Sequence, residues 1–276
     1  MEQITDAVAY HGEGPCWHES WDGIRWVDML AGDLLTFDGT SVDRLHVGKV
    51  AAFVRPRSGG GYVVGLENTV ALASSAFGDP YPLPPFFTDP NLRFNEGGTD
   101  PWGGLYLGTM AYDRTEGAGQ LYHVDAEGRR STVLESVTTS NGIAFTADGT
   151  RAYYNDTKLR RTDVFDVENR TLVNRRPFAD SDGASPDGLT VDREGNVWVA
   201  HNRKGRVRQY SPTGAILTEL TLPVQLVTAV TLGGEDYRTL YVTTSRENLK
   251  DPEPEAGALF AARVDVPGFP AFSYGG

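Results

Sequence analysis

The chain has 276 residues and a formal net charge of −12, with 37 acidic against 25 basic side chains. This excess of acid argues against nucleic acid or an anionic membrane as a partner, because binding phosphate groups requires clustered Lys and Arg. The single cysteine, Cys16, excludes an intrachain disulfide and a cysteine zinc cluster. The N-terminus lacks the features of a secretory signal, and no apolar run approaches the length of a membrane span. We therefore expect a soluble, cytoplasmic protein.

Short strands rich in aromatic and β-branched residues recur along the whole chain. Six segments share this character: IRWVD (24–28), GYVVG (61–65), LYLGT (105–109), AYYND (152–156), VWVAH (197–201) and LYVTT (240–244). Each is followed by a second apolar segment: DLLTFD, TVALAS, GQLYHVD, TDVFDV, GRVRQYS and GALFAA. The central aromatic residues of the first set are 36 to 47 residues apart. Asp22-Gly23 and Asp148-Gly149, which precede two of the strands, are interpreted as ordinary turns.

A repeat of this length predicts a β-propeller. A unit of about 40–50 residues with about four short strands is typical of one propeller blade. We therefore predict an all-β fold, a six-bladed β-propeller with about four antiparallel strands per blade, formed by residues 1–276 as a single domain. A β-sandwich or barrel is the alternative, although its strands do not repeat one motif in this way. The proline-rich segment 78–90 is expected to be a long loop between blades that overhangs one face of the ring.

Acidic and amide residues recur at the predicted starts of the inner strands. In a propeller the first strand of every blade lines the central channel, and alignment of the repeats puts these strands at GEGPCW, VAAFV, RFNEGG, SNGIAF, PDGLTV and VTAVTL. Four of them carry a polar residue at the equivalent position: Glu13, Asn95, Asn141 and Asp187. Glycine directly follows all of these except Asn95, and we expect it to let the backbone turn tightly and approach a ligand. The alternative is that these pairs only form turns.

Two carboxylates that face each other across a narrow channel repel by roughly 4 kcal/mol at about 4 Å, for an effective dielectric constant near 20. A divalent cation between Glu13 and Asp187 removes this cost, and Asn141 adds a neutral carbonyl oxygen. Oxygen ligands of this kind suit Ca²⁺, Mg²⁺ or Mn²⁺, and Zn²⁺ less specifically. Because three protein ligands leave positions open for water and substrate, the pattern predicts a catalytic site with one divalent metal cation as cofactor.

The combined motifs resemble a known family. GEGPCW, RFNEGGTDPWGGLYLGTM, SNGIAF, PDGLTVDREGNVWVA, EAGALF and FSYGG are similar to motifs of the regucalcin/gluconolactonase (senescence-marker-protein-like) family, over nearly the whole chain and in the right order. Members are six-bladed propellers that hydrolyse sugar lactones to aldonic acids with a divalent cation. The resemblance implies metal ligands at Glu13, Asn141 and Asp187, and substrate-binding residues at Arg93 and Asn95.

The chain departs from the family after the GTM motif. Animal members carry acidic residues there that help to hold the substrate, whereas this chain has Tyr112 and Asp113. We expect Tyr112 and Asp113 to contact the substrate, with Asp113 standing in for the longer acid. This departure bears on which sugar is bound more than on the reaction.

Opening a lactone requires a polarised carbonyl, an activated water and a proton for the departing ring oxygen. Asp187 is the predicted general base, and it is expected to serve as a metal ligand as well because a carboxylate has two oxygens. Arg93 and Asn95 lie two residues apart, so on a strand their side chains face the same way. Arg93 is expected to donate to a lactone oxygen and Asn95 to bind hydroxyls. His201 is expected to reach the channel rim and contact substrate.

Two other functions remain open from the residues alone. One is a metal-dependent phosphotriesterase or a hydrolase of lipophilic lactones and aryl esters, which would need apolar walls around the site. The other is a non-catalytic binding propeller, which would need no acid and amide cluster in its channel. The expected partner is a small sugar lactone, and we expect a monomer or weak dimer that binds neither nucleic acid nor membranes.

Overall fold

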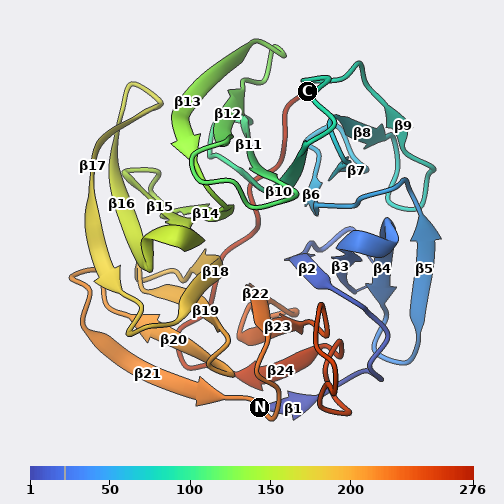
Figure 1. The fold of residues 1–276 in the computed structure, drawn as a ribbon, viewed down its shortest axis with the longest axis vertical. Coiled ribbons are helices and arrows are strands. Elements are labelled where there is room, and N and C mark those ends of the chain that lie inside the picture. The colour runs from blue at the N-terminus through green and yellow to red at the C-terminus, as the bar shows by residue number, and fades with distance from the viewer. Residues whose placement is uncertain (22) are drawn as a thin grey trace.

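The computed structural model describes residues 1–21 and 23–276, and within them six four-stranded antiparallel sheets surround a central axis (Figure 1). This confirms the predicted six-bladed β-propeller. The described residues contain no α-helix, only the short 3-10 helices η1 (Met29–Ala31) and η2 (Thr157–Leu159). Accordingly, no helix in this part of the chain is long and apolar enough to cross a membrane. Asp22, assigned to a turn from the sequence, lies outside the described residues.

Five blades place their four strands in chain order from the axis outward, and the sixth does so for its first three strands. The inner strands are β2 (Gly12–Trp17), β6 (Phe53–Pro56), β10 (Leu92–Thr99), β14 (Ser140–Phe145), β18 (Ser185–Val191) and β22 (Val227–Gly233). The second strands are β3 (Ile24–Asp28), β7 (Tyr62–Gly65), β11 (Leu105–Ala111), β15 (Arg151–Asp156), β19 (Val197–Asn202) and β23 (Thr239–Thr244). Both sets overlap the segments that the repeat predicted, although β6 begins near the end of VAAFV and extends beyond it to Pro56.

The third strands correspond to the second apolar segment of each repeat. They are β4 (Asp33–Phe37), β8 (Val70–Ala73), β12 (Gly119–Val124), β16 (Arg161–Glu168), β20 (Arg206–Tyr210) and β24 (Phe260–Arg263). The outer strands are β5 (Val42–His46), β9 (Tyr81–Pro82), β13 (Arg130–Val137), β17 (Thr171–Asp180), β21 (Ile216–Thr221) and β1 (Glu2–Gln3). The N-terminal β1 pairs with β24 and completes the last blade, so the two ends of the ring are joined by strand pairing.

The core lies between the blades because the second strands are buried on both faces. In β15, for example, Tyr154 packs toward the third blade with Tyr106 and Phe145, whereas Tyr153 packs toward the fifth blade with Val197. The other hydrophobic clusters join consecutive blades in the same way. Alternate side chains of one strand thus stabilise two different interfaces, which explains why these strands read as unbroken apolar runs.

The proline-rich segment 78–90 differs from the expectation. It contains β9, which pairs with β8 and forms the outer edge of the second blade. Phe86 and Phe87 then pack edge-on against Phe94 of the third blade, with ring centroids 5.4 and 5.3 Å apart. The segment is therefore held against the side of the ring, because its apolar residues have a buried surface to cover, rather than overhanging one face.

The C-terminal segment 264–276 crosses one end of the channel (Figure 1). The backbone amides of Gly268, Tyr274 and Gly275 donate to Tyr237, Pro56 and Gly103, at 2.8, 2.8 and 2.9 Å. The hydroxyl of Thr99 donates to the carbonyl of Phe272 at 2.6 Å. These partners come from the ends of inner strands or from the turns that follow them. The predicted catalytic residues lie at the opposite end, where the inner strands begin.

Candidate metal centre and substrate cavity

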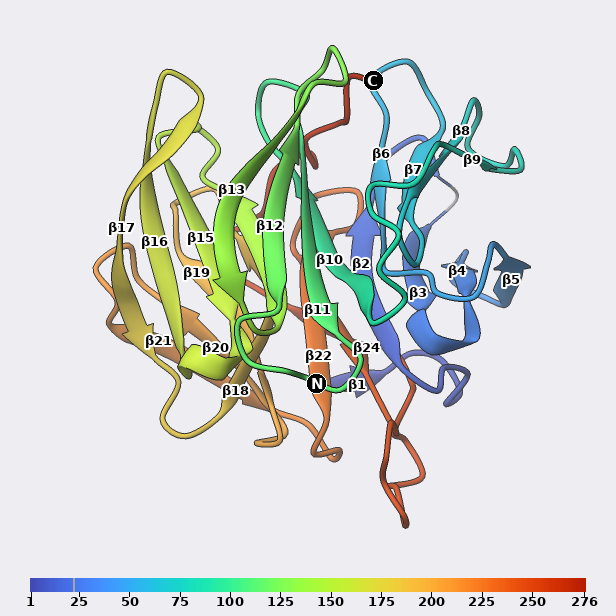
Figure 2. The same ribbon diagram turned by 45° about the horizontal axis from the view of Figure 1, so that its top comes forward.

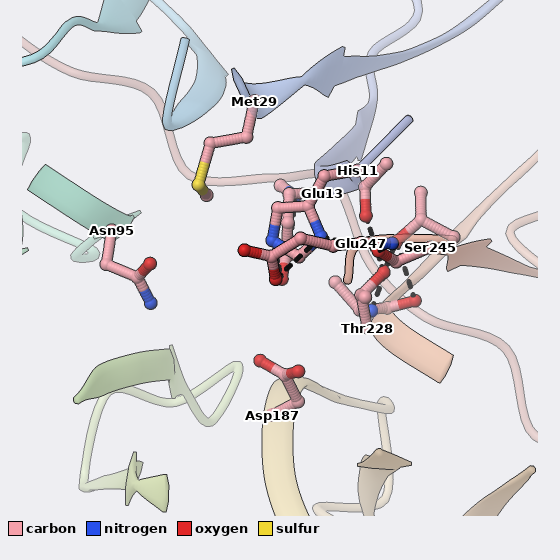
Figure 3. Close-up of polar contacts among 12 residues, drawn as sticks. His11, Glu13, Met29, Asn95, Asp187, Thr228, Ser245 and Glu247 are labelled. Carbon is pink, nitrogen blue, oxygen red and sulfur yellow. Dashed lines mark hydrogen bonds and ion pairs between the residues drawn. The ribbon is translucent and has the colours of Figure 1, made fainter. Parts of the chain in front are cut away.

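A cavity of about 270 Å³ opens at the end of the channel where the inner strands begin and the second strands finish. It is small, near the lower limit for ligand pockets, so it suits a compact substrate. Its lining includes the predicted residues Glu13, Arg93, Asn95, Tyr112, Asn141 and Asp187. Figure 3 shows the carboxylates of Glu13 and Asp187 and the amide of Asn95 directed toward one common space. The repeat therefore predicted correctly which residues meet.

β-Bulges turn these side chains into the channel. The register between inner and second strands shifts between Glu13 and Cys16, between Phe94 and Glu96, between Ser140 and Ile143, and between Pro186 and Leu189. A bulge leaves a residue out of the ladder and re-aims its side chain. Asn95, Asn141 and Asp187 are themselves such unpaired residues, which is why polar groups can interrupt otherwise apolar strands.

Glycine is required after the polar residues for a different reason from the one expected. A Cβ on Gly142 would lie 2.5 Å from the backbone nitrogen of Leu189 in the next inner strand. On Gly188 it would lie 2.7 Å from the Cα of Ala229, and on Gly14 2.7 Å from the Cα of Phe53. Glycine is therefore required by the close approach of neighbouring inner strands. Only Gly14 of these three also has a positive φ, of 53°.

Asp187 is a buried carboxylate with one oxygen free. Its Oδ2 accepts a hydrogen bond from Asn202 Nδ2 at 2.7 Å, whereas its Oδ1 is buried without a hydrogen-bond partner. Burial raises the pKa of Asp187 to about 8, and the nearby charges of Glu96 and Glu247 act in the same direction. An unsatisfied buried carboxylate oxygen is costly unless a proton or a cation is bound there.

Glu13 lies opposite Asp187 and is only 3% exposed. Burial raises the pKa of Glu13 well above its ordinary value, and the charges of Asp187 and Glu96 raise it further. Its Oε2 accepts from the amide of Gly14 at 3.1 Å, and its Oε1 lies 4.0 Å from His11 Nε2. Glu13 and Asp187 are thus two buried acids with raised pKa values, and a divalent cation would balance their negative charge.

Asn141 can contribute an oxygen, because hydrogen bonds fix which way its amide is turned. Its Nδ2 donates to Thr157 Oγ1 at 2.7 Å, and that hydroxyl donates in turn to the carbonyl of Pro186 at 2.8 Å. Asn141 Oδ1 accepts only a longer bond, from Asn95 Nδ2 at 3.3 Å. Across residues 1–21 and 23–276, no three His, Cys, Asp or Glu side chains form a metal-binding group. A cation centre here would therefore depend on this neutral amide oxygen beside two carboxylates, a donor set that suits hard cations.

Arg93 and Asn95 form a connected pair on the neighbouring wall. Arg93 donates to Asn95 Oδ1 at 2.7 Å, and Asn95 Nδ2 donates to the carbonyl of Ser140 at 2.8 Å. The guanidinium of Arg93 also contacts the sulfur of Met29 at 3.1 Å and lies 5.8 Å from the ring centroid of Tyr112. Burial lowers the pKa of Arg93 from its ordinary value. Both side chains face the cavity, as their spacing predicted.

Tyr112 forms part of the cavity mouth and is 40% exposed. Its hydroxyl donates to Glu67 Oε1 at 2.6 Å. Asp113, by contrast, does not line the cavity, and the expectation that it replaces a substrate-binding acid is corrected. Its Oδ1 instead accepts from the amide and hydroxyl of Thr115, at 2.9 and 2.7 Å, because an exposed aspartate readily stabilises the turn that follows it.

The expectation that His201 reaches the channel rim and contacts substrate is also corrected. His201 is 0% exposed and does not line the cavity. Its ring lies 3.1 Å from the hydroxyl of Tyr210 and accepts a long bond from Arg206 at 3.4 Å. Burial lowers the pKa of His201 to about 3. Successive side chains of a strand point to opposite faces, so the next residue, Asn202, is the one that reaches Asp187.

Several cavity residues were missed in the sequence analysis. His11 Nδ1 lies 2.7 Å from Ser245 Oγ, and burial lowers the pKa of His11 to about 4, which keeps the ring neutral. Glu247 lies in the connection between β23 and β24, which projects from the site face (Figure 2). Arg114 and Arg203 reach the cavity from the turns after β11 and β19. These residues, like Asn202 of β19, lie outside the repeated inner strands, so the repeat gave no signal for them.

Comparisons with known proteins agree with the fold. Residues 11–246 match the family described as SMP-30/Gluconolactonase/LRE-like region. The chain belongs to this family. It is 38% identical to a 6-deoxy-6-sulfogluconolactonase of Pseudomonas putida, over 93% of this chain and 92% of that protein. It is 31% identical to a pentonolactonase of Haloferax volcanii, over 99% and 97% of the two chains.

Among solved structures, the regucalcin of Agrobacterium tumefaciens, described as a calcium-binding protein, superposes with a TM-score of 0.92 at 26% identity. The match covers 99% of this chain and 97% of that one. The resemblance stated from the motifs is thereby confirmed. Membership of the SMP-30/gluconolactonase family also confirms that the chain belongs with hydrolases of the lactonase class.

Proposed function

We propose that this protein hydrolyses a sugar lactone to the aldonic acid in this cavity, with one divalent cation held by Glu13, Asn141 and Asp187. The single observation that carries the proposal is the buried, unpartnered Oδ1 of Asp187. The Asp187 carboxylate lies across from the carboxylate of Glu13 (Figure 3), and Asn141 lines the same cavity. The relatives named for a sulfogluconolactone and a pentonolactone support a sugar lactone as the substrate class.

The cation would polarise the lactone carbonyl and lower the pKa of water, which is the chemistry that such an ion supplies to hydrolases. The chain supplies the remaining functions. Asp187 accepts a proton from the attacking water, and Asn202 holds its carboxylate in a single orientation for that transfer. The water oxygen bonds to the carbonyl carbon as the carbonyl π bond opens, which leaves a negative charge on the former carbonyl oxygen. When the carbonyl forms again, the ring carbon–oxygen bond breaks and the proton on Asp187 passes to the departing ring oxygen.

Arg93 and Asn95 would position the lactone beside Asp187. The guanidinium of Arg93 is pre-oriented by Asn95 and Met29, so it can donate to a lactone oxygen without reorganising as negative charge develops there. The amide of Asn95 can bind a ring hydroxyl. Most of the lining is polar or charged, and Met110 and Leu226 are among its few apolar residues. This composition favours a polyhydroxylated lactone over lipophilic lactones, aryl esters or phosphotriesters.

Metal removal tests the proposal. We expect dialysis against EDTA to abolish hydrolysis of aldonolactones in a pH-indicator assay, and added Ca²⁺, Mg²⁺, Mn²⁺ or Zn²⁺ to restore it. The control is circular dichroism of the dialysed protein, which should show an intact fold. Full activity in the metal-free protein would show that the reaction needs no cation, but it would not contradict the lactonase assignment. Absence of activity on every lactone with every cation would remove the assignment itself.

A further inference from the structure

We propose that the substrate carries a terminal anionic group remote from the lactone carbonyl, and that Arg114 and Arg203 bind this group at the cavity mouth. The shared chemistry is a tetrahedral or planar oxyanion, namely a sulfonate, a phosphate or a carboxylate. The inference rests on the proposed function because it assigns the substrate class of the same site.

Arg203 is an unpaired cation beside the reaction centre. It lines the cavity and directly follows Asn202, which binds Asp187, yet it has no hydrogen bond or ion pair to any residue that the structure describes. Its backbone has a φ of 65°, a conformation that non-glycine residues seldom adopt. A guanidinium presents a planar fork of donors that fits an oxyanion through two parallel hydrogen bonds.

Arg114 approaches the same cavity from another blade. It follows β11, also has a positive φ, of 60°, and lies within electrostatic range of Asp187 and Arg93. The ion pair that the structure shows for it is long, with 3.8 Å between its NH2 and Glu247 Oε2, and its side chain is 56% exposed. Such a loose exposed pair contributes little stability, so an incoming anion can take over the guanidinium.

The charge balance of the cavity also favours an anion. Three described guanidinium groups line it, from Arg93, Arg114 and Arg203, and they face three carboxylates, from Glu13, Asp187 and Glu247. Their formal charges cancel, so a bound dication would leave the cavity positive by two. The chain as a whole carries −12, so the cavity with its cation bound would be a positive region on an acidic molecule. This positive charge would not attract a neutral lactone, whereas it would attract an anionic lactone at short range.

The test compares gluconolactone with the same ring bearing a sulfonate, a phosphate or a carboxylate at carbon 6. We expect the native protein to prefer at least one anionic lactone by about 10- to 100-fold in kcat/KM, the range for one or two charge-assisted hydrogen bonds. The lactone with the highest kcat/KM identifies which oxyanion, a sulfonate, a phosphate or a carboxylate, the site binds best. Arg203→Gln and Arg114→Gln should each lower kcat/KM for that lactone about 10-fold or more, and for gluconolactone by a clearly smaller factor.

Arg170→Gln is the matched control. Arg170 is likewise an exposed arginine with a positive φ, of 63°, but it lies in the turn between β16 and β17 and does not line the cavity. This variant should retain native kcat/KM for both lactones. Raising the ionic strength should weaken turnover of the anionic lactone and leave that of gluconolactone nearly constant.

Binding provides a readout that does not depend on turnover. Titration calorimetry of the cation-loaded protein uses the open-chain 6-sulfo acid and gluconate, neither of which has a lactone bond to hydrolyse. The 6-sulfo acid should bind more tightly than gluconate, and Arg203→Gln should abolish this difference. Equal binding of the two acids, or equal losses for both in the variant, would overturn the inference. Hydrolysis of gluconolactone without any preference for an anion would overturn it too, while leaving the lactonase function intact.

Discussion

Asp187 combines burial, one unpartnered oxygen and a raised pKa, a combination that an ordinary surface aspartate lacks. Asn202 holds one of its oxygens, and the cavity faces the other. Perturbed carboxylates of this kind concentrate at functional sites because their burial has to be offset by a ligand or a reaction. At the residue scale, we therefore propose that the function depends on this carboxylate.

The first prediction concerns the charge of Asp187. Asp187→Asn should lower kcat/KM for a sugar lactone by at least about 100-fold, since it removes the general base and a cation ligand together. Its unfolding free energy at neutral pH without added cation should stay the same or rise. The native carboxyl must take up a proton or remain a buried anion on folding, and asparagine avoids this cost. Asp113→Asn is the matched control and should keep native activity. A large loss in that variant would restore Asp113 as a substrate-binding residue.

The second prediction concerns pH. The pKa of Asp187 in the folded, metal-free protein is about 8, above the ordinary value of 3.8, so the folded state binds this proton more tightly than the unfolded state. Proton binding by Asp187 therefore contributes to the unfolding free energy. This contribution is fully present below about pH 4 and is lost as the pH rises toward 8. Urea unfolding in EDTA should show this decline, and Asp187→Asn should flatten it. A divalent cation should stabilise the native protein more at pH 8 than at pH 5.

At the element scale, bulged inner strands and glycines together build the site. The bulges take Asn95, Asn141 and Asp187 out of the ladders, and glycines such as Gly142 let neighbouring inner strands approach closely. The repeat can be recognised in the sequence because several blades carry the same combination of a bulged inner strand, a polar residue and a glycine. Its consequence, convergence of the polar groups, follows from closure of the ring.

The third prediction tests the spacing of the inner strands. Gly142→Ala should lower the unfolding free energy by about 1–3 kcal/mol, because its Cβ would meet the backbone nitrogen of Leu189 at 2.5 Å. It should also weaken cation binding, since Asn141 must shift with the strand. Urea unfolding and cation titration measure the two effects. Gly59→Ala is the control, because nothing lies within 4 Å of a Cβ there. Unchanged stability in Gly142→Ala would contradict this account of the glycines.

At the scale of the whole molecule, the two ends of the channel have separate tasks. The cavity occupies one end, and the C-terminal segment crosses the other, where Tyr274 is 4% exposed and pairs with Arg57 across a parallel bridge. Together with β1, this segment ties distant parts of the ring to one another. Stability and catalysis can therefore be altered independently.

The fourth prediction uses this separation. Tyr274→Ala should cost about 3 kcal/mol of unfolding free energy through lost burial, while KM for the lactone stays near the native value. Thermal unfolding and steady-state kinetics on the same preparation measure both. Tyr81→Ala, at a tyrosine that is 54% exposed, should change stability by no more than about 0.5 kcal/mol. A raised KM in Tyr274→Ala would show that the two ends are coupled.

The blade repeat and the inner strands could be predicted from the residues alone, because each blade repeats the same local pattern of strand, polar residue and turn. The same repeat predicted that Glu13, Asn95, Asn141 and Asp187 meet once the ring closes. That Asn202 rather than His201 reaches the site became clear only in the folded chain. Both faces of β19 are buried, so no contrast of polar and apolar residues marks its orientation. The tertiary structure also decided that Arg114, Arg203 and Glu247 join the cavity, since they lie in connections of unequal length that the closed ring gathers around one axis.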